Sequence, residues 1–401
     1  MPDRPPSPFK DLNPFVLVLS TALAVALMNS SAPTPLYPLY QQHVHLTTVD
    51  LSLIFGAYGV GVLVALLAMT GLANSFQDLR PLFIAASLLV LIGAVAFGHG
   101  TSLRALCGAR LIAGLGSGLM TTVVNIVLVR VLKTSNEKLP ALLASLAMVG
   151  GLALGPLIAG LALQQNLSPT HAPFTLVAVA CVVAALAALS RWPNAAGAHG
   201  PRKSEISSLT KALHGIGRPF HLCAWSVFFS WSFAACIFVV GPEVAQQTFG
   251  LQQRGSFGYA LCAYLLIAGI SQICCQRLQA WLAVRTGWWV QWLSIVLLLL
   301  AIHLQHLYLA LIALALAGYA YGALFVGNAR LVNQMAPPHA HGVLIAYFYT
   351  TIYLFNATPI PMGWLVDAYG LVPACSMALG AFLALGMALY SLTLLPRFSG
   401  R

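Results

Sequence analysis

The sequence predicts an all-α integral membrane protein with twelve transmembrane helices, arranged as two pseudo-symmetric halves of six. Three observations lead to this fold class. The 401 residues are 59% hydrophobic and only 7% charged, apolar runs of membrane-spanning length recur along the chain, and one polar segment divides these runs into two equal sets. A soluble domain carries about 25% charged residues, so the composition excludes an ordinary soluble protein. The chain also lacks the alternating ten-residue segments typical of transmembrane β-strands.

The expected helices are separate apolar runs. A helix that crosses the hydrocarbon core needs at least about 17 predominantly apolar residues. The runs that reach this length are 15–36, 49–72, 82–98, 103–131, 141–164, 174–192, 219–242, 255–276, 288–304, 307–331, 342–364 and 371–395. The first run has no small-residue cleavage site, so we expect a retained helix rather than a signal peptide. Pro33, Pro35 and Pro38 near its outer end predict a distorted terminus.

The positive charges lie mostly on one side of the expected membrane. Of the 19 Lys and Arg residues, 16 lie on the side of the N-terminus, Arg104 and Arg254 lie on the opposite side, and Arg110 lies inside a span. Cytoplasmic loops of membrane proteins carry such an excess of Lys and Arg. We therefore expect cytoplasmic N- and C-termini, and we attribute the net charge of +11 to topology rather than to a nucleic-acid partner.

An internal duplication is indicated by matches between the two parts of the chain. The polar stretch 193–217, expected to be a cytoplasmic linker, separates residues 1–192 from residues 218–401. A shift of 200 pairs Gly118 with Gly318 and Arg130 with Arg330, a shift of 203 pairs Pro156 and Gly160 with Pro359 and Gly363, and a shift of 206 pairs Tyr58 with Tyr264. Two parallel repeats are one architecture of secondary transporters, which bind substrate between the repeats near the membrane midplane.

The fifth span contains helix-breaking residues in the pattern Gly151-x-x-x-Gly155-Pro156-x-x-Ala159-Gly160. Glycine and proline destabilise a helix in water, but in lipid the helix is enforced because every backbone polar group needs an internal partner. Small residues at every fourth position form a ridge that lets another helix approach closely. Pro156 removes the hydrogen bond to the carbonyl of residue 152 and favours a bend. Generic small-residue packing is the alternative interpretation.

The fourth span contains a buried cation in the pattern Leu106-x-x-x-Arg110-x-x-Ala113-Gly114-x-Gly116-x-Gly118. Arg110 lies seven residues into the helix, which corresponds to roughly 10 Å at 1.5 Å per residue. A guanidinium at this depth is costly and normally faces protein or a water-filled cavity. The alternative is that the side chain extends outward to the membrane surface.

The span number, the central loop and these two motifs resemble the major facilitator superfamily over essentially the whole chain. The fifth span resembles the antiporter motif G-x-x-x-G-P-x-x-G-G, with Ala159 at the penultimate glycine, and the fourth resembles the family's fourth-helix motif, with Ala113 in place of glutamine. The resemblance to the drug or metabolite:proton antiporter branch implies export in exchange for protons and a role for Arg110 in proton coupling or charge recognition. It also implies contact between the fifth and eighth spans, where Gly258 and Gly269 are possible partners.

The loop between the second and third spans matches the family's cytoplasmic gate motif, G-x-x-x-D-R-x-G-R-R, only in part. Gly71 and Arg80 match, Ser75 replaces the aspartate, and Asp78 follows three residues later. The resemblance implies a gate contact of Asp78 with Arg80 or Arg130. A solvated turn explains the same residues equally well.

Acidic residues are few, and none of the eight lies at the centre of an expected span. Proton-driven transporters usually protonate a buried carboxyl group. Asp50 and Glu243, near the outer mouths of the second and seventh spans, are the candidates for this role, although Asp50 also suits a helix N-cap. The missing central carboxylate supports an alternative function, an importer or facilitator of a small metabolite such as a sugar, an organic anion or an amino-acid-like compound.

Polar and aromatic side chains in the spans that the resemblance places around the transport path are candidates for the substrate cavity. They are Asn29 and Tyr37 in the first span, Asn125 in the fourth, Trp231 in the seventh, Tyr321 in the tenth, and Tyr349 and Asn356 in the eleventh. Polar groups at this depth need partners or water, so each is either a ligand or a packing residue. Such a cavity, with Arg110 as its one deep cation, suits a neutral, apolar or anionic amphipathic substrate.

Other functional classes have little support in the sequence. The cysteines form no C-x-x-C pair, the histidine pairs lack further ligands nearby, and no P-loop, H-E-x-x-H or G-x-S-x-G motif is present. We expect no enzyme activity, no cofactor and no metal. We expect a monomer in a bacterial inner membrane whose partners are a small-molecule substrate, protons and the lipid bilayer.

Overall fold

The computed structural model describes residues 13–72, 78–132, 139–193, 213–251, 253, 255–337 and 340–393. This part of the chain contains helices and no strand, and twelve helical segments are long and apolar enough to cross a membrane. The predicted all-α membrane fold is therefore confirmed. The expected linker, 193–217, falls mainly on residues 194–212, which lie outside the described residues.

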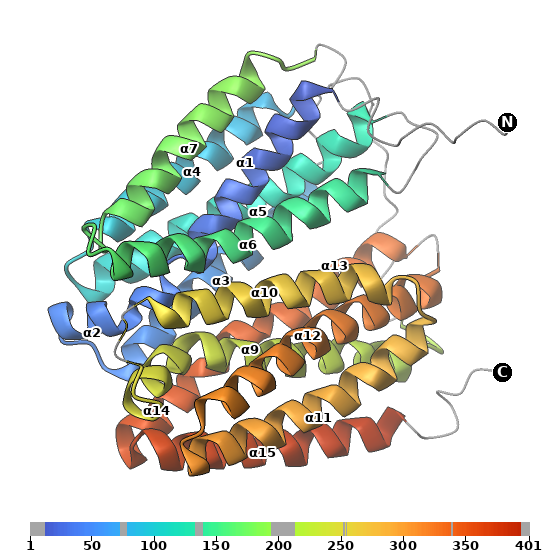
Figure 1. Cartoon of the computed structure of the whole chain (residues 1–401). Helices are drawn as coiled ribbons and strands as arrows, with labels where there is room; N and C mark the ends of the chain where they lie inside the picture. The colour runs from blue at the N-terminus through green and yellow to red at the C-terminus, as the bar shows by residue number, and fades with distance from the viewer. Residues whose placement is uncertain are drawn as a thin grey trace, which may run out of the picture.

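The helices follow the expected order along the chain (Figure 1). The first six spans comprise α1 (Pro14–Ser31) with η1 (Thr34–Leu36) and α2 (Tyr37–Val44), α3 (Thr48–Leu72), α4 (Arg80–Gly98), α5 (Leu103–Val131), α6 (Leu139–Gln164) and α7 (Ala172–Leu189). The last six comprise α9 (Gly217–Gln247), α10 (Ser256–Cys275), α11 (Ala280–Leu304), α12 (Leu307–Met335), α13 (His341–Tyr353) with η3 (Leu354–Ala357) and α14 (Pro359–Tyr369), and α15 (Leu371–Thr393).

Five spans extend at least four residues beyond their predicted bounds. The seventh ends at Gln247 instead of residue 242 and the tenth at Met335 instead of residue 331, while the first, ninth and eleventh differ as follows. The first was expected to end at residue 36, but after the break at Pro33 the chain continues as η1 and α2 to Val44. The ninth begins at Ala280 instead of residue 288, because a helix continues past its apolar run once it leaves the hydrocarbon core. The eleventh, expected as one run, is divided by η3 just before Pro359, because proline cannot donate the backbone hydrogen bond that would continue α13.

The helices form two groups, which we call the N-terminal group (α1–α7) and the C-terminal group (α9–α15). The main contacts between the groups are α6 against α10, and α3 against α13, η3 and α14. In Figure 1 the groups lie close together at the end of the bundle that carries α2 and α14, and diverge toward the end where α1 begins and α15 ends. We call these the α2 end and the opposite end. Among the described residues, the contacts between the groups thus concentrate toward the α2 end, and along α6 and α10 they extend from Gly160 and Gly255 to Val149 and Gly269.

Three helices that begin at the α2 end have side-chain caps: α3, α5, and α12, whose Leu309 N–H donates a hydrogen bond to the His306 Nδ1 at 3.3 Å. The hydroxyl of Thr47 accepts a hydrogen bond from the Asp50 N–H at 3.1 Å, and the Asp50 carboxylate accepts one from the Thr47 N–H at 2.9 Å. This reciprocal pair is a capping box, which satisfies two N–H groups at the start of α3. Ser102 accepts a hydrogen bond from the Ala105 N–H at the start of α5. The helix-capping interpretation of Asp50 is therefore confirmed.

Candidate functional site

Arg110 is buried inside the N-terminal group. Its side chain is 2% exposed, its Nη1 donates a hydrogen bond to the carbonyl of Ser30 at 2.9 Å, and its guanidinium lies 4.5 Å from the ring centre of Tyr58. Ser30 belongs to the last turn of α1, whose carbonyls lack intrahelical donors. A cation over an aromatic face is stabilised most when it is desolvated. The side chain thus joins α5 to α1 and α3 and does not extend to the membrane surface.

Tyr37 lies beside Arg110 at the start of α2 and is 1% exposed. Its hydroxyl lies close to the Arg110 guanidinium, but neither this hydroxyl nor the Nε of Arg110 makes a hydrogen bond of good geometry with the described residues. A buried polar atom without a partner costs about 1–3 kcal/mol, so these two groups are available to a hydrogen-bonding ligand or to water. The structure therefore places together two of the residues that the sequence singled out on different spans.

An aromatic cluster in the C-terminal group contains two further predicted cavity residues. The cluster consists of Trp231, Tyr321, Phe325, Tyr353 and Phe355. Trp231 stacks on Tyr321 with ring centres 5.3 Å apart and planes 6° apart, and it contacts the rings of the other three at 5.3–6.3 Å. The buried indole N–H of Trp231 has no partner among the described residues. The cluster therefore offers flat apolar faces and, at the Trp231 indole, a donor without a partner among the described residues.

Asn356 connects this cluster to the N-terminal group. Its amide donates a hydrogen bond to the carbonyl of Tyr353 at 3.0 Å. Its side chain fills the space over Gly59 of α3, where an added Cβ would lie 2.0 Å from the Asn356 Cγ. Tyr349 lies one turn before Tyr353 on α13, with its ring 5.7 Å from that of Phe348. These two candidates therefore lie on α13 and η3, which both contact α3.

The other two cavity candidates, Asn29 and Asn125, form hydrogen bonds to backbone carbonyls of the N-terminal group. The amide of Asn29 donates a hydrogen bond to the Val90 carbonyl of α4 at 3.4 Å, and that of Asn125 donates to the Thr121 carbonyl in its own helix at 2.7 Å. Neither contact reaches the aromatic cluster. The structure brings the candidates together in two places, around Arg110 and around Trp231, and leaves these two asparagines outside both.

Two carboxylates at the α2 end lie close to the junction between the groups. Glu243 of α9 accepts a hydrogen bond from the Gln247 amide at 2.9 Å, while its other oxygen is buried without a partner among the described residues. Asp367 of α14 accepts hydrogen bonds from the N–H groups of Thr48 and Val49, both at 3.0 Å. A carboxylate at a helix N-terminus is stabilised by the free N–H groups and the helix dipole. Asp367 therefore caps α3 from the other group, a role that sequence reasoning missed.

The two junctions between the groups repeat the same contacts. In one, Gly258 of α10 lies against the Pro156 carbonyl, so that an added Cβ would approach this oxygen to 2.5 Å. In the other, the Ser52 hydroxyl of α3 donates a hydrogen bond to the Pro359 carbonyl at 2.8 Å. A shift of 203 relates the two prolines and a shift of 206 relates Ser52 to Gly258. The offsets found in the sequence thus correspond to equivalent contacts in space.

The same relationship extends by one turn toward the α2 end. Gly160 packs against α10, and a Cβ added to it would lie 2.9 Å from the Gly255 carbonyl. Gly363 packs against α3, and a Cβ added to it would lie 2.8 Å from the Thr48 carbonyl. Gln164, four residues after Gly160, accepts a hydrogen bond from the Tyr259 hydroxyl of α10. The residue equivalent to Gln164 at a shift of 203 is Asp367. This offset is the signal in the sequence from which Asp367 could have been found.

The fourth and tenth spans correct one of the predicted offsets. An added Cβ on Gly114 would lie 2.1 Å from the Tyr58 carbonyl, and one on Gly318 would lie 2.7 Å from the Tyr264 carbonyl. Gly318 is therefore equivalent to Gly114, and not to Gly118 as the shift of 200 predicted. The correct shift in these spans is 204, which removes the proposed match of Arg130 with Arg330 and places Leu314 at the position of Arg110.

The glycine ridge of the fifth span faces two neighbours instead of one. An added Cβ would approach the Ala24 carbonyl to 2.2 Å from Gly151, and the Met28 carbonyl to 2.5 Å from Gly155. Both contacts are with α1 in the same group, so the expectation that these two glycines face the other half was wrong. Pro156 and Gly160 do face α10, and Gly269 of α10 packs on Val149 of α6. The expected contact with the eighth span is therefore confirmed.

The break that Pro156 makes in α6 is compensated from α1. Because proline has no N–H, the Leu152 carbonyl loses its intrahelical donor. The Ser31 hydroxyl donates a hydrogen bond to this carbonyl at 2.8 Å. A serine in the first span therefore completes the hydrogen bonding of the fifth.

The candidate gate residues lie at the opposite end. The Asp78 carboxylate accepts a hydrogen bond from the Arg80 N–H at 2.9 Å and lies 3.8 Å from the Arg80 Nε, with both side chains exposed. Arg130 lies in the last turn of α5, where the helix dipole stabilises a cation. Gly71 lies in the last turn of α3, and the loop 73–77 that follows it is outside the described residues. The pair of Asp78 and Arg80 is thus local to the start of α4.

Comparison with known proteins identifies the family. The sequence matches the Major Facilitator Superfamily over residues 19–358, whereas no curated protein matches the chain. Among solved structures, the nucleoside transporter NupG is similar with a TM-score of 0.72 at 14% identity, covering 94% of this chain and 98% of that one. A bacterial homologue of the human lysosomal transporter Spinster, in an inward-facing and occupied conformation, has a TM-score of 0.71 at 13% identity and covers 94% and 95%. A POT family transporter in complex with a thioalcohol-conjugated peptide has a TM-score of 0.71 at 13% identity and covers 96% of both chains.

These likenesses agree with the twelve helices, the two groups and their repeated junctions. At 13–14% identity they show the fold and not the substrate. The family match covers most of the chain and carries the assignment. The protein is an integral membrane transporter that belongs to the Major Facilitator Superfamily.

Proposed function

We propose that this transporter is a secondary exporter of small amphipathic compounds that works by alternating access and exchanges its substrate for protons. The observation that carries the proposal is the pair of repeated junctions at the α2 end, where α6 meets α10 and α14 meets α3. With the termini on the cytoplasmic side, as the charge distribution favours, these junctions close the outer end while the groups diverge toward the cytoplasm. The described conformation is then inward-facing and ready to load substrate for export.

The substrate in this proposal binds between Arg110 and the aromatic cluster. Arg110 and Tyr37 offer hydrogen-bond donors without partners on one side, and Trp231 offers a donor and a flat face on the other. Among the described residues, no carboxylate lies at mid-span to attract a cation. A neutral or anionic compound with an aromatic or apolar body fits these groups best.

Proton exchange in this proposal depends on the carboxylates at the α2 end. An arginine stays protonated in proteins, so Arg110 cannot release the proton itself. Glu243 has a buried oxygen without a partner among the described residues, whereas Asp50 is engaged in the capping box. Glu243 is therefore the better candidate for the proton carrier, with Arg110 as the fixed charge.

An importer or facilitator remains the second candidate, favoured by the absence of a mid-span carboxylate from the described residues. Transport into proteoliposomes under an imposed pH gradient tests both functions. Exchange predicts that substrate flux follows the gradient and falls with Arg110→Ala and Glu243→Gln. Flux that ignores the gradient and survives both substitutions would establish a facilitator. Uptake in whole cells determines the direction.

A further inference from the structure

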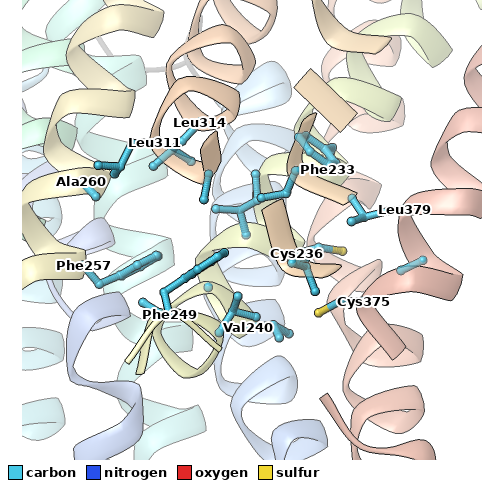
Figure 2. A pocket seen from close by; sticks show the side chains of 18 of the residues that line it. Phe233, Cys236, Val240, Phe249, Phe257, Ala260, Leu311, Leu314, Cys375 and Leu379 are labelled. Atoms are coloured by element: carbon cyan, nitrogen blue, oxygen red, sulfur yellow. The ribbon is translucent and has the colours of Figure 1, made fainter. Parts of the chain in front are cut away.

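An apolar cavity lies inside the C-terminal group at the α2 end, away from the aromatic cluster. It is surrounded by α9, α10, α11, α12, α14 and α15, and its volume is about 120 Å³. Figure 2 shows Phe233, Cys236 and Val240 of α9, Leu311 and Leu314 of α12, and Cys375 of α15 around it. Neither Trp231 nor Tyr321 lines it. The cavity is therefore distinct from the proposed substrate site.

The lining provides no strong hydrogen-bonding side chain. It consists of aliphatic and aromatic side chains and the thiols of Cys236 and Cys375, and buried free cysteines behave as small hydrophobic residues. An apolar cavity of this kind stays dry and takes up hydrocarbon, as one of about 150 Å³ lined by Leu, Ile and Phe does with benzene. The chemistry of the lining therefore selects a hydrocarbon ligand.

The lining of the cavity includes a position at which the two groups differ. Leu314 lies one turn before Gly318, as Arg110 lies one turn before Gly114, and these glycines make equivalent contacts. In the N-terminal group the long side chain of Arg110 fills this place and reaches Ser30. In the C-terminal group Leu314 is shorter and lines the open volume instead. At this position the C-terminal group thus has an apolar side chain where the N-terminal group has a cation.

The size of the cavity restricts the ligand further. A site for a complete drug-sized molecule occupies about 300–1,000 Å³, so this cavity holds only a hydrocarbon segment of a larger molecule. Leu311, which lines it, is also 41% exposed on the outer surface of α12. In a bilayer this surface faces lipid, where acyl chains are the most abundant hydrocarbon.

We propose that this cavity binds the end of a lipid acyl chain, which enters from the membrane beside Leu311. The bound segment lies next to the part of α9 that contains Gly241 and Pro242. Pro242 removes one backbone hydrogen bond from this helix. Gly241 lies against the Phe257 ring, and a Cβ added to Gly241 would lie 2.6 Å from the Phe257 Cζ. A hydrocarbon segment in the cavity supports α9 at this weakened turn. The proposal does not depend on the transported substrate.

Photolabelling in proteoliposomes tests the proposal. The probe is a phosphatidylcholine with a diazirine near the end of one acyl chain, and the labelled residues are located by mass spectrometry after irradiation. Phe233 and Val240 are each 2% exposed, so a lipid that only coats the surface cannot reach them. We expect adducts on these two residues as well as on Leu300, which is 46% exposed and does not line the cavity.

A filling variant and a matched control complete the test. Ala310 lines the cavity, whereas Ile312 on the same helix is 53% exposed and does not. Ala310→Phe should reduce labelling of Val240 on the order of tenfold, the effect of about 1.4 kcal/mol, and leave Leu300 labelled, while Ile312→Phe should change neither. If Ala310→Phe does not fold, judged by thermal unfolding, Leu314→Phe fills the cavity from the next turn.

Two results would overturn the proposal. One is labelling of Leu300 in the wild-type protein without labelling of Phe233 or Val240. The other is labelling of Val240 that persists in the folded filling variant. Neither outcome bears on transport, so a failure here is distinguishable from a failure of the proposed export.

Discussion

The carboxylate of Asp367 in α14 caps the N-terminus of α3 by accepting a hydrogen bond from the Thr48 N–H at 3.0 Å. The second carboxylate oxygen accepts one from Val49 at the same distance. The contact joins residues 319 positions apart and connects the two groups at the α2 end. Opening this end in an alternating-access cycle requires that both bonds break.

Replacing Asp367 with alanine should therefore favour opening of the α2 end. Hydrogen bonds to charged groups contribute about 1.5–3 kcal/mol each, so the open population should rise by at least tenfold. Spin labels on Leu167 and Gln305, exposed at the α2 end of each group, would report a longer distance by pulsed electron resonance.

The matched control is Asp78→Ala at the opposite end. Among the described residues, Asp78 pairs with Arg80 of its own group, so its loss should leave the distance between the labels unchanged. A distance distribution for Asp367→Ala identical to that of the wild type would show that the capping contact does not hold the end closed.

Ser31 and Pro156 should show a strong energetic coupling. Ser31→Ala leaves the Leu152 carbonyl without a donor, which should cost about 1–3 kcal/mol of stability. Pro156→Ala supplies the missing N–H within α6, so the double variant should lose less than Ser31→Ala alone. Thermal unfolding of the four proteins of this cycle measures the coupling.

Ser20→Ala is the control for this cycle. Among the described residues, the Ser20 hydroxyl bonds to the Val16 carbonyl of its own helix, so its loss should change stability by less than about 0.5 kcal/mol. Additive effects of Ser31→Ala and Pro156→Ala would refute the compensation.

Glycines at the junction should be far less tolerant than other glycines of the C-terminal group. A Cβ on Gly258 would lie 2.5 Å from the Pro156 carbonyl and 2.9 Å from the Gly160 Cα, and these backbone atoms cannot move aside without shifting α6. Gly258→Ala should therefore separate α6 from α10 and reduce transport. Gly380→Ala, where no atom lies within 4 Å of the added Cβ, should retain transport. Equal activity of the two variants would contradict the close packing at this junction.

The sequence predicts the helices well because the membrane leaves few alternatives. Backbone groups in hydrocarbon must be satisfied within the segment, so apolar length alone identified the twelve spans. The same criterion ended the first span too early, since Gln41, Gln42 and His43 carry α2 beyond the apolar run. The break at Pro33 was predicted because proline cannot continue a helix, whereas the division of the eleventh span before Pro359 was not.

The faces of the helices were harder to predict. A helix that is hydrophobic all round has no polar side to indicate which face packs inward. The ridge of α6 therefore gave no sign that Gly151 would face α1 while Gly160 faces α10. The contacts of Asp367 with Thr48 and of Ser31 with Leu152 depend on these rotations, and only the repeat offset pointed to the first. Trp231 and Tyr321 were identified by type, but their stacking needed the structure.

The pair of Arg110 and Tyr58 should be sensitive to the geometry of the cation and not only to its charge. Lysine cannot combine the hydrogen bond to the Ser30 carbonyl with a planar contact on the Tyr58 ring. We expect Arg110→Lys to lower the initial transport rate on the order of tenfold, which corresponds to about 1.4 kcal/mol. Tyr58→Phe keeps the aromatic face and should retain transport, whereas Tyr58→Leu removes it and should lower the rate as Arg110→Lys does. Initial rates in proteoliposomes, compared at equal amounts of folded protein, measure these effects.

Two outcomes would contradict this prediction. A transport rate for Arg110→Lys equal to that of the wild type would mean that charge alone is needed at this position. A lower transport rate for Tyr58→Phe would mean that the Tyr58 hydroxyl, and not its aromatic face, is needed.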